Sequence, residues 1–170
     1  MSDSVSDSVV GPVVRRARPG DLDAVGEITV AAYAEFTDGP DDYYLDLLRD
    51  AARRDREAEL WVAEVDGVVV GSVTIALPGS PWREIGTDEE GEFRMLAVSP
   101  DARRMGAGDA LTRLVLDRCR ELGFRRIVLS SLASMSSAHR IYERLGYRRI
   151  PDRDWSPQPD VHLIAFAKDL

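Results

Sequence analysis

The stretch from Arg103 to Gly108 combines two arginines with two glycines. It follows the apolar run FRMLAV (93–98) and precedes DALTRLVLDRCREL (109–122), which has the spacing of an amphipathic helix. The first turn of a helix presents backbone N–H groups without intrahelical partners, and its positive dipole end favours anions. Glycine at 106 and 108 lets a phosphate approach the backbone, and the arginines add charged donors. The stretch therefore predicts a cradle for a diphosphate.

Two other phosphate-binding loops do not fit these residues. A P-loop needs G-x-x-x-x-G-K-[S/T], but the chain has a single lysine, Lys168, far along the sequence. A dinucleotide fingerprint needs G-x-G-x-x-G, whereas residues 106–111 read GAGDAL. The remaining pattern is R-x-x-G-x-G after a strand that ends in LAVSP.

Two longer segments contain this pattern. They are EFRMLAVSPDARRMGAGDALTRLVLDRCRELGFRRIVLSS (92–131) and AHRIYERLGYRRI (138–150). Together they resemble the acetyl-CoA-binding half of the GNAT superfamily of acyl-CoA-dependent N-acetyltransferases. The motifs cover residues 92–150, and the order of elements in the rest of the chain agrees with that fold.

The resemblance implies acetyl-CoA (coenzyme A) as the co-substrate. It assigns the coenzyme diphosphate to the backbone amides and helix start of the cradle, and the pantetheine arm to the strand before it. The implied diphosphate residues are Arg103, Arg104, Met105, Gly106, Ala107 and Gly108, and the implied pantetheine residues are Leu96, Ala97 and Val98. In the family this strand splays from its neighbour, which the sequence alone does not show.

Tyr142 matches the tyrosine that commonly protonates the leaving sulfur in this family. A tyrosine hydroxyl has an ordinary pKa near 10 and stays protonated at pH 7, so it could donate to a thiolate. The alternative is core packing, since Tyr142 shares a helical apolar stripe with Ala138, Ile141 and Leu145. One departure is Met135, where the family often has a coenzyme-binding asparagine; Ser134, Ser136 or Ser137 could replace it.

Glu92 begins the strand before the cradle, where some family members carry a glutamate that deprotonates the incoming ammonium. We predict this role for Glu92. The alternative is a solvated carboxylate at a strand edge within the acidic run 88–92, and other carboxylates could serve as the base.

The acceptor side carries both aromatic and acidic residues, which suit a cationic amine. In this fold the first two helices, the loop 78–90 and the connection 151–160 would surround the acceptor, or these could be ordinary surface residues. We expect a small-molecule amine or a peptide amine, with peptide N-termini, lysine side chains, polyamines, amino acids and aminoglycosides all open. The residues concerned are Phe36, Asp38, Asp41, Asp42, Tyr43, Tyr44, Trp82 and Trp155.

Composition narrows the other classes of function. The chain has 170 residues, 44% hydrophobic composition and a formal net charge of -8, which disfavours a nucleic-acid binder. No run approaches a membrane span, and the N-terminus lacks a basic and then apolar leader, so we expect a cytoplasmic protein without membrane association. Cys119 is the only cysteine and lies on an apolar helix face, while His139 and His162 are isolated, so no metal is predicted.

The periodicity predicts elements that position these residues. After a tail over 1–12, a single domain fills 13–170, with a strand at 13–18, a helix over 21–36 capped by Asp21, and a second helix over 41–56. Residues 59–77 form a hairpin about Asp66-Gly67, followed by the loop 78–90. Strands at 92–98, 126–130, 147–150 and 161–168 alternate with helices over 108–122, which Gly123 caps, and 134–145.

The predicted fold class is α/β (α+β). It is a GNAT-like, mixed and mostly antiparallel central sheet of about six to seven strands flanked by about four helices, with a parallel β-α-β coenzyme-binding core.

Two functions remain open from the sequence. The first is an N-acetyltransferase that transfers acetyl from acetyl-CoA to a primary amine by direct attack in a ternary complex. The second is a non-catalytic acyl-CoA-binding sensor or interaction module. A homodimer is possible in either case, because sheet edges in this fold commonly support one.

Overall fold

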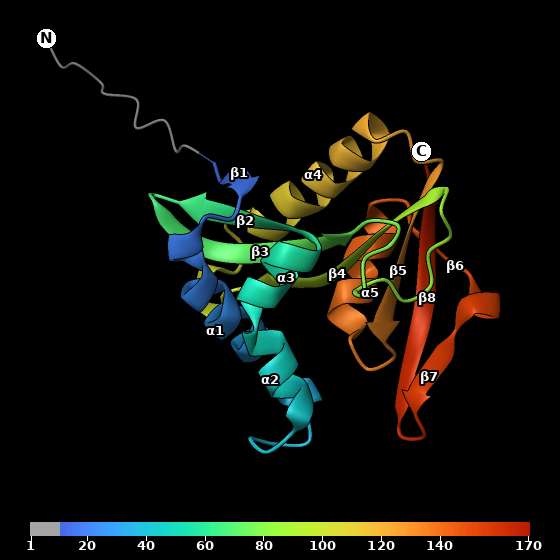
Figure 1. The fold of residues 1–170 in the computed structure, drawn as a ribbon, viewed down its shortest axis with the longest axis horizontal. Coiled ribbons are helices and arrows are strands. Elements are labelled where there is room, and N and C mark those ends of the chain that lie inside the picture. The colour runs from blue at the N-terminus through green and yellow to red at the C-terminus, as the bar shows by residue number, and fades with distance from the viewer. Residues whose placement is uncertain (1–10) are drawn as a thin grey trace, which may run out of the picture.

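The structure is a computed structural model that describes residues 11–170. Most of the predicted tail, residues 1–10, lies outside the described residues. Eight strands form one sheet in the order β1-β2-β3-β4-β5-β8-β6, and β7 pairs with β8 beside this path (Figure 1). The strands are β1 Val13–Arg16, β2 Glu59–Val65, β3 Val68–Ala76, β4 Glu90–Val98, β5 Arg126–Leu132, β6 Arg148–Arg149, β7 Trp155–Gln158 and β8 Val161–Asp169.

Every neighbouring pair of strands is antiparallel except β4 and β5, which are parallel. The helix between them makes the predicted β-α-β unit, so the predicted fold class is confirmed. The predicted strand count is too low because β7 lies in a segment that was expected to be irregular. Its sequence, WSPQ, contains a proline and has no apolar alternation.

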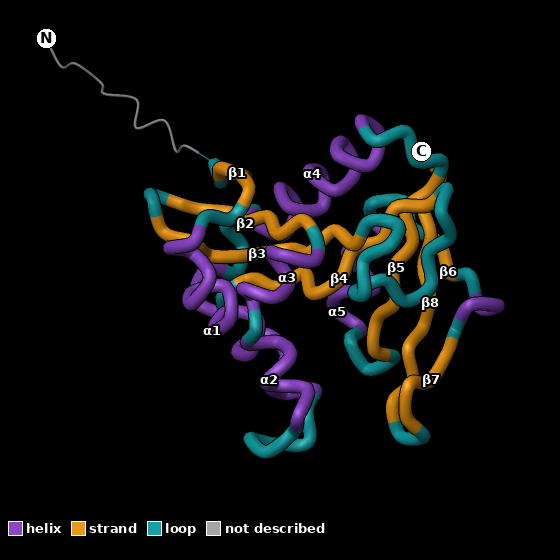
Figure 2. The backbone as a smooth tube through the Cα atoms, viewed as in Figure 1, coloured by secondary structure: helices purple, strands orange, loops and turns teal. Residues whose placement is uncertain are grey.

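The helices are α1 Leu22–Tyr33, α2 Tyr43–Arg49, α3 Ala51–Glu57, α4 Ala107–Glu121 and α5 Ser136–Arg144 (Figure 2). The prediction of one helix over 41–56 is wrong. Asp50, with φ −79° and ψ 65°, leaves the helical region and its carboxylate accepts the N–H of Arg53, so it ends α2 and caps α3. Asp42 caps α2 in the same way through the N–H of Tyr44.

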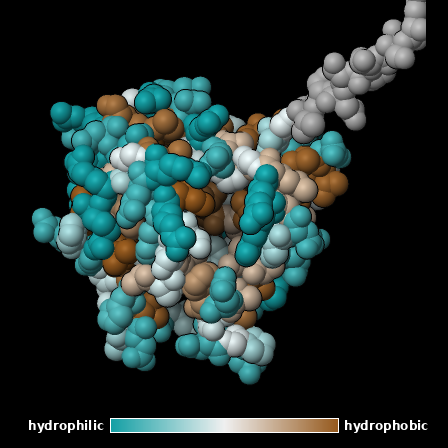
Figure 3. All heavy atoms as spheres, turned by 180° about the vertical axis from the view of Figure 1, so that it is seen from behind, coloured by the Kyte–Doolittle hydropathy of each residue, from teal (hydrophilic) through white to brown (hydrophobic). Residues whose placement is uncertain are grey.

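The helices cover both faces of the sheet (Figure 1). On one face α4 and α5 enclose a core that includes Phe93, Leu111, Val115 and Phe166. On the other face α1, α2 and α3 pack on two smaller clusters of apolar side chains. Viewed from behind, apolar atoms come to the surface between hydrophilic side chains (Figure 3).

The predicted turns and caps have mixed outcomes. Asp66 and Gly67 have φ of 52° and 78°, which confirms the tight hairpin, and Gly123 has φ of 78° after α4. Asp21 does not cap α1, because its carboxylate instead accepts the N–H of Arg18 and pairs with Arg15 at 2.7 Å. Leu122, the residue after the last one of α4, is 38% exposed.

Among residues 11–170, no helix is long and apolar enough to cross a membrane.

Candidate active site

The strands β4 and β5 are paired over only three positions. Glu90, Gly91 and Glu92 face Arg126, Ile127 and Val128. Beyond them β5 continues to Leu132 beside β8, whereas residues 93–98 of β4 pair, among residues 11–170, with β3 alone. The two strands therefore separate after Glu92, and one edge of β4 is open. An unpaired edge offers backbone N–H and C=O groups to an extended ligand.

A β-bulge lies in this open part of β4. Met95 has φ of 53°, and the register shifts there because Thr74 pairs with Arg94 while Ser72 pairs with Ala97. Phe93 packs in the core beside α4, whereas Met95, two residues later, packs on the α2 side. The bulge thus turns β4 side chains toward the face covered by α1 and α2, as bulges beside functional sites often do.

The predicted diphosphate residues gather at the start of α4. Gly106 is the N-cap, with φ of 83° in the left-handed region, and among residues 11–170 no side chain caps the helix. Within the described part of the chain, a Cβ on Gly106 would meet only Pro12, at 3.9 Å, and one on Gly108 would meet only Val98, at 3.8 Å. The helix start is accessible and lies beside the end of β4, so its shape and chemistry fit a diphosphate.

Charged side chains surround this helix start. Arg103 and Arg104 are exposed, and Met105 between them and the glycines is 49% exposed. Asp109 in the first helical turn would repel an anion, but its carboxylate pairs at 2.9 Å with Arg144 from α5. This ion pair offsets the negative charge and connects the cradle to the helix that carries Tyr142.

Tyr142 is 6% exposed and its ring belongs to the core. The ring centroid lies 6.0 Å from that of Phe93, 5.9 Å from Tyr147 and 5.8 Å from Phe166. Burial raises the pKa of the Tyr142 hydroxyl, so this group stays protonated at neutral pH. The structure therefore shows the packing of the ring directly, and the proton-donating role of its hydroxyl stays a prediction.

Tyr33, the last residue of α1, packs with Trp82 and Met95 in the cluster on the α2 side of the sheet. Burial raises the pKa of Tyr33, and the charges of the Tyr142 and Tyr44 phenols raise it further, so this phenol stays protonated at neutral pH.

Glu92 is fully buried, so the alternative of a solvated carboxylate at a strand edge is wrong. One carboxylate oxygen accepts the N–H of Glu84 at 2.8 Å, and the other accepts those of Ile85 at 3.0 Å and Gly86 at 2.6 Å. Both oxygens thus hold the loop before β4. Its role as a base stays a prediction.

The residues predicted for the acceptor side divide into two groups. Tyr44 and Trp82 pack with Tyr33 and Met95 in one cluster next to the open part of β4. The others lie further out. Tyr43 is exposed and accepts a hydrogen bond from Gln158, and Trp155 donates to Ser130 at 3.1 Å. Asp42 caps α2, Asp38 and Asp41 are exposed, and Phe36 lies in the turn after α1.

Sequence reasoning missed three residues on this side: Tyr33, Glu84 and Arg94. Glu84 and Arg94 form an ion pair at 2.9 Å with side chains 12% and 14% exposed. The Arg94 guanidinium lies 5.7 Å from the Trp82 ring centroid and donates to the Trp82 carbonyl at 3.1 Å. Burial raises the pKa of Glu84 to about 7. No local sequence pattern marks this pair, because it joins a loop to a strand.

The remaining candidates have structural roles. Cys119 is buried, and burial raises the pKa of its thiol to about 12, which supports the predicted core position. His139 bonds Ser131 at 3.1 Å and the Leu132 carbonyl at 3.0 Å through Nε2. Met135 is the N-cap residue of α5. No three His, Cys, Asp or Glu side chains in residues 11–170 are grouped to hold a metal ion.

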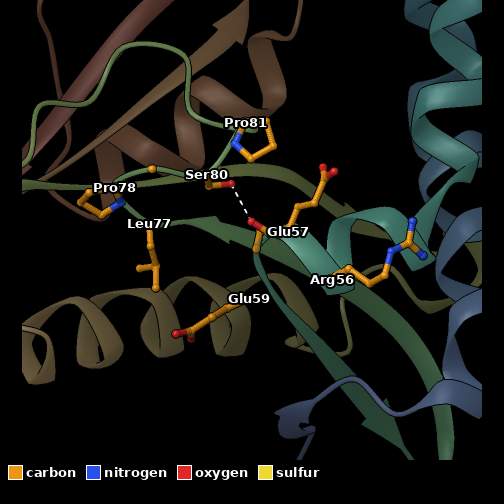
Figure 4. A pocket seen from close by; sticks show the side chains of 9 residues that line it. Arg56, Glu57, Glu59, Leu77, Pro78, Ser80 and Pro81 are labelled. Atoms are coloured by element: carbon orange, nitrogen blue, oxygen red, sulfur yellow. Dashed lines mark hydrogen bonds between the residues drawn. The ribbon is translucent and has the colours of Figure 1, made fainter.

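One surface pocket lies outside this region. It is lined by residues from the α3–β2 connection and from the start of the loop after β3, including Glu57, Glu59 and Ser80 (Figure 4). Ser80 Oγ donates to the Glu57 carbonyl at 2.8 Å, and Trp82 Nε1 donates to the Glu57 carboxylate at 2.8 Å. These bonds fix the first part of the loop that continues to Glu84.

The sequence of the chain is similar to those of known acetyltransferases. The model of the Acetyltransferase (GNAT) family matches residues 22–147. The chain belongs to the GNAT acetyltransferase family. It is 35% identical to a mycothiol acetyltransferase from Cellulomonas flavigena over 160 residues, which cover 88% of this chain and 44% of that protein. The chain thus spans less than half the length of this GNAT relative.

Solved structures of GNAT proteins share the fold. An acetyltransferase of the GNAT family from Staphylococcus aureus superimposes with a TM-score of 0.74 at 17% identity, covering 94% of this chain and 99% of that one. The structure of yncA from Salmonella typhimurium with its cofactor acetyl-CoA has a TM-score of 0.67 at 20% identity and covers 95% of both chains. At these identities the likeness concerns the fold alone.

Proposed function

We propose that this GNAT protein is an N-acetyltransferase that transfers the acetyl group of acetyl-CoA to a primary amine by direct attack in a ternary complex. The observation that supports it most is the uncapped, glycine-lined start of α4 beside the open edge of β4. A diphosphate and an amide-bearing arm are the parts of coenzyme A that suit these two features.

Different residues of the chain would bind the two parts of the coenzyme. The amides of residues 106–108 and the arginines at 103 and 104 would hold the diphosphate. The backbone of Leu96, Ala97 and Val98 would pair with the pantetheine arm. When bound, acetyl-CoA supplies an activated acyl group as a thioester. The residues must then orient the thioester, accept a proton from the amine and donate a proton to the sulfur.

Tyr142 is the proposed proton donor to the sulfur. Its ring is held by packing against Phe93 on β4 and Phe166 on β8, and its raised pKa keeps the proton in place until a thiolate forms. The proposed acceptor is a small-molecule or peptide amine that is cationic in solution. Tyr44, which is half-buried in the cluster on the α2 side, supports this, because aromatic faces attract cations.

Three further predictions belong with this proposal: one domain over residues 13–170, a cytoplasmic location, and a homodimer as a possible assembly.

A non-catalytic acyl-CoA-binding module is the second candidate. Met135 at the start of α5, in place of the family's asparagine, favours it. Glu92 also favours the non-catalytic module, because both of its carboxylate oxygens already accept N–H groups of the loop.

One experiment separates the two functions. Thiol release from acetyl-CoA is measured with glucosamine, spermidine, aspartate and a peptide with an N-terminal alanine, and coenzyme A affinity is measured by calorimetry. Turnover of at least one amine supports the enzyme. Binding without turnover supports the module, and failure to bind coenzyme A contradicts both.

A further inference from the structure

The loop between β3 and β4 carries a buried carboxylate that the proposed function does not yet use. The Glu84 side chain is 12% exposed, and its Oε1 forms an ion pair with Arg94 Nε at 2.9 Å. Its backbone N–H is held by Glu92, so the position of Glu84 is fixed by a strand residue. A buried carboxylate held in place beside a cleft is a candidate for proton transfer.

Glu84 and Glu92 are neighbours with different surroundings. The Glu92 carboxylate accepts three backbone N–H groups and is fully buried. The Glu84 carboxylate has one charged partner and remains partly open to solvent. Of the two, Glu84 has more freedom to accept a proton, because doing so breaks no bond to a backbone amide.

The position of Glu84 follows from that of Arg94. Glu92 is the last β4 residue paired with β5, so Arg94 lies on the open part of β4, two residues beyond the point where the strands separate. Trp82, under the Arg94 guanidinium, packs in the cluster that contains Tyr33 and Tyr44. The Glu84 carboxylate therefore lies beside the gap, on the α1 and α2 face.

The charged and titratable neighbours of Glu84 come from two elements. Burial raises its pKa to about 7, Arg94 on β4 opposes this increase, and the Glu92 charge adds to it. Burial, with a smaller addition from the Glu84 charge, raises the pKa of Tyr44 on α2, so Tyr44 is neutral at pH 7. A carboxylate with a pKa near the working pH is suited to general base catalysis.

We propose that Glu84, rather than Glu92, accepts the proton of the acceptor's ammonium group before the amine attacks. This inference rests on the proposed N-acetyltransferase function. Glu84 takes one proton from the ammonium nitrogen, which frees its electron pair to form the C–N bond as the C–S bond breaks. The nitrogen loses a second proton to solvent, the departing thiolate takes the proton of Tyr142, and Tyr142 regains a proton from solvent. Glu84 then returns its proton to solvent, so one acetamide, one thiol and one released proton result.

The test compares pH profiles of kcat/KM for three proteins with the amines named above. The wild type should show an ascending limb near pH 7. Glu84→Gln should lower kcat/KM at pH 7 by about 100-fold or more and move the limb toward the pKa of the amine itself. Affinity for coenzyme A, measured by calorimetry, should not change. Glu89→Gln is the matched control, since Glu89 is an exposed carboxylate of the same loop, and it should match the wild type.

A second readout needs no turnover. Because folding raises the pKa of Glu84 from 4.5 to about 7, its contribution to stability is present at low pH and is lost as pH rises through this range. Glutamine does not titrate. The melting temperature of Glu84→Gln should therefore rise relative to the wild type between about pH 5 and about pH 8.

The outcomes distinguish this inference from the proposed function. An unchanged kcat/KM profile in Glu84→Gln, or a constant difference in melting temperature, overturns the role of Glu84 and leaves the enzyme standing. A wild type that turns over no amine overturns the function, and the inference fails with it. If Glu84→Gln does not fold, Glu84→Asp replaces it. A lower rate with the ascending limb of the pH profile still below the pKa of the amine supports the role of Glu84. An unchanged rate refutes it.

Discussion

At the scale of single residues, Tyr142 shows why a sequence pattern leaves a role open. Its apolar stripe predicted a core position, and the family motif implied proton donation. Both can be true, because the ring packs against Phe93 and Phe166 while the hydroxyl carries the chemistry. Helical spacing reports which face a residue occupies, but it does not report where the last atom of a long side chain ends.

We predict that Tyr142→Phe lowers the rate of thiol release about ten- to a thousandfold with little change in coenzyme A affinity. The substitution keeps the ring and removes only the proton donor. Tyr147→Phe is the control, because the Tyr147 hydroxyl is buried without a hydrogen-bond partner within residues 11–170, and its loss should not reduce the rate or the melting temperature. Equal rates for wild type and Tyr142→Phe would reduce Tyr142 to a packing residue.

Gly106 gives a second prediction at this scale. Gly106→Ala forces alanine into the left-handed region, which costs about 1 to 2 kcal/mol, and places a methyl group where the diphosphate would lie. Gly123→Ala at the other end of α4 imposes similar strain, with a φ of 78° and no atom of residues 11–170 within 4 Å of the new Cβ. Both variants should melt at lower temperature, but only Gly106→Ala should lose coenzyme A affinity by calorimetry. Equal affinities in the two variants would refute the cradle.

At the scale of elements, local patterns predicted most of the fold. The apolar spacing placed α4 within one residue, and Asp66-Gly67 placed the hairpin. The errors concern interactions between distant residues or competing local signals, such as the break at Asp50 and the short strand β7. The Glu84–Arg94 pair and the Glu92 contacts were not predictable, since both depend on how a loop folds back on β4.

The loop between β3 and β4 therefore has a testable anchor. Glu92→Gln keeps one carbonyl oxygen but replaces the other oxygen with an N–H donor that cannot accept from a loop amide. Leaving buried amides unpaired should cost about 1 to 3 kcal/mol and loosen residues 84–86. Hydrogen exchange should be faster at these three amides. Exchange as slow as in the wild type would show that the loop is held by other contacts.

At the scale of the whole molecule, the parallel pairing of β4 with β5 is a short connection that joins β1–β4 to the rest of the sheet. It involves three residue pairs, whereas β5 and β8 pair over seven. The helix α4 contacts β2, β3 and β4 on one side of this pairing and β5 on the other, so it also connects the two parts of the sheet. The sequence predicted the parallel pair but not its length, because the apolar character of both strands continues past the point where they separate.

A ligand bound between β4 and β5 would bridge the two parts of the sheet. At 100 times its dissociation constant, acetyl-CoA should stabilise the folded state by about 2.7 kcal/mol. For a chain of this size, each kcal/mol should raise the melting temperature by about 2 to 4 °C. Binding should slow hydrogen exchange most at residues 93–98 and 106–109. The backbone amides of these residues would bond to the pantetheine arm and to the diphosphate. Protection spread evenly over the chain, or confined to the pocket beside Glu57, would place the coenzyme elsewhere and remove the basis for assigning the gap to catalysis.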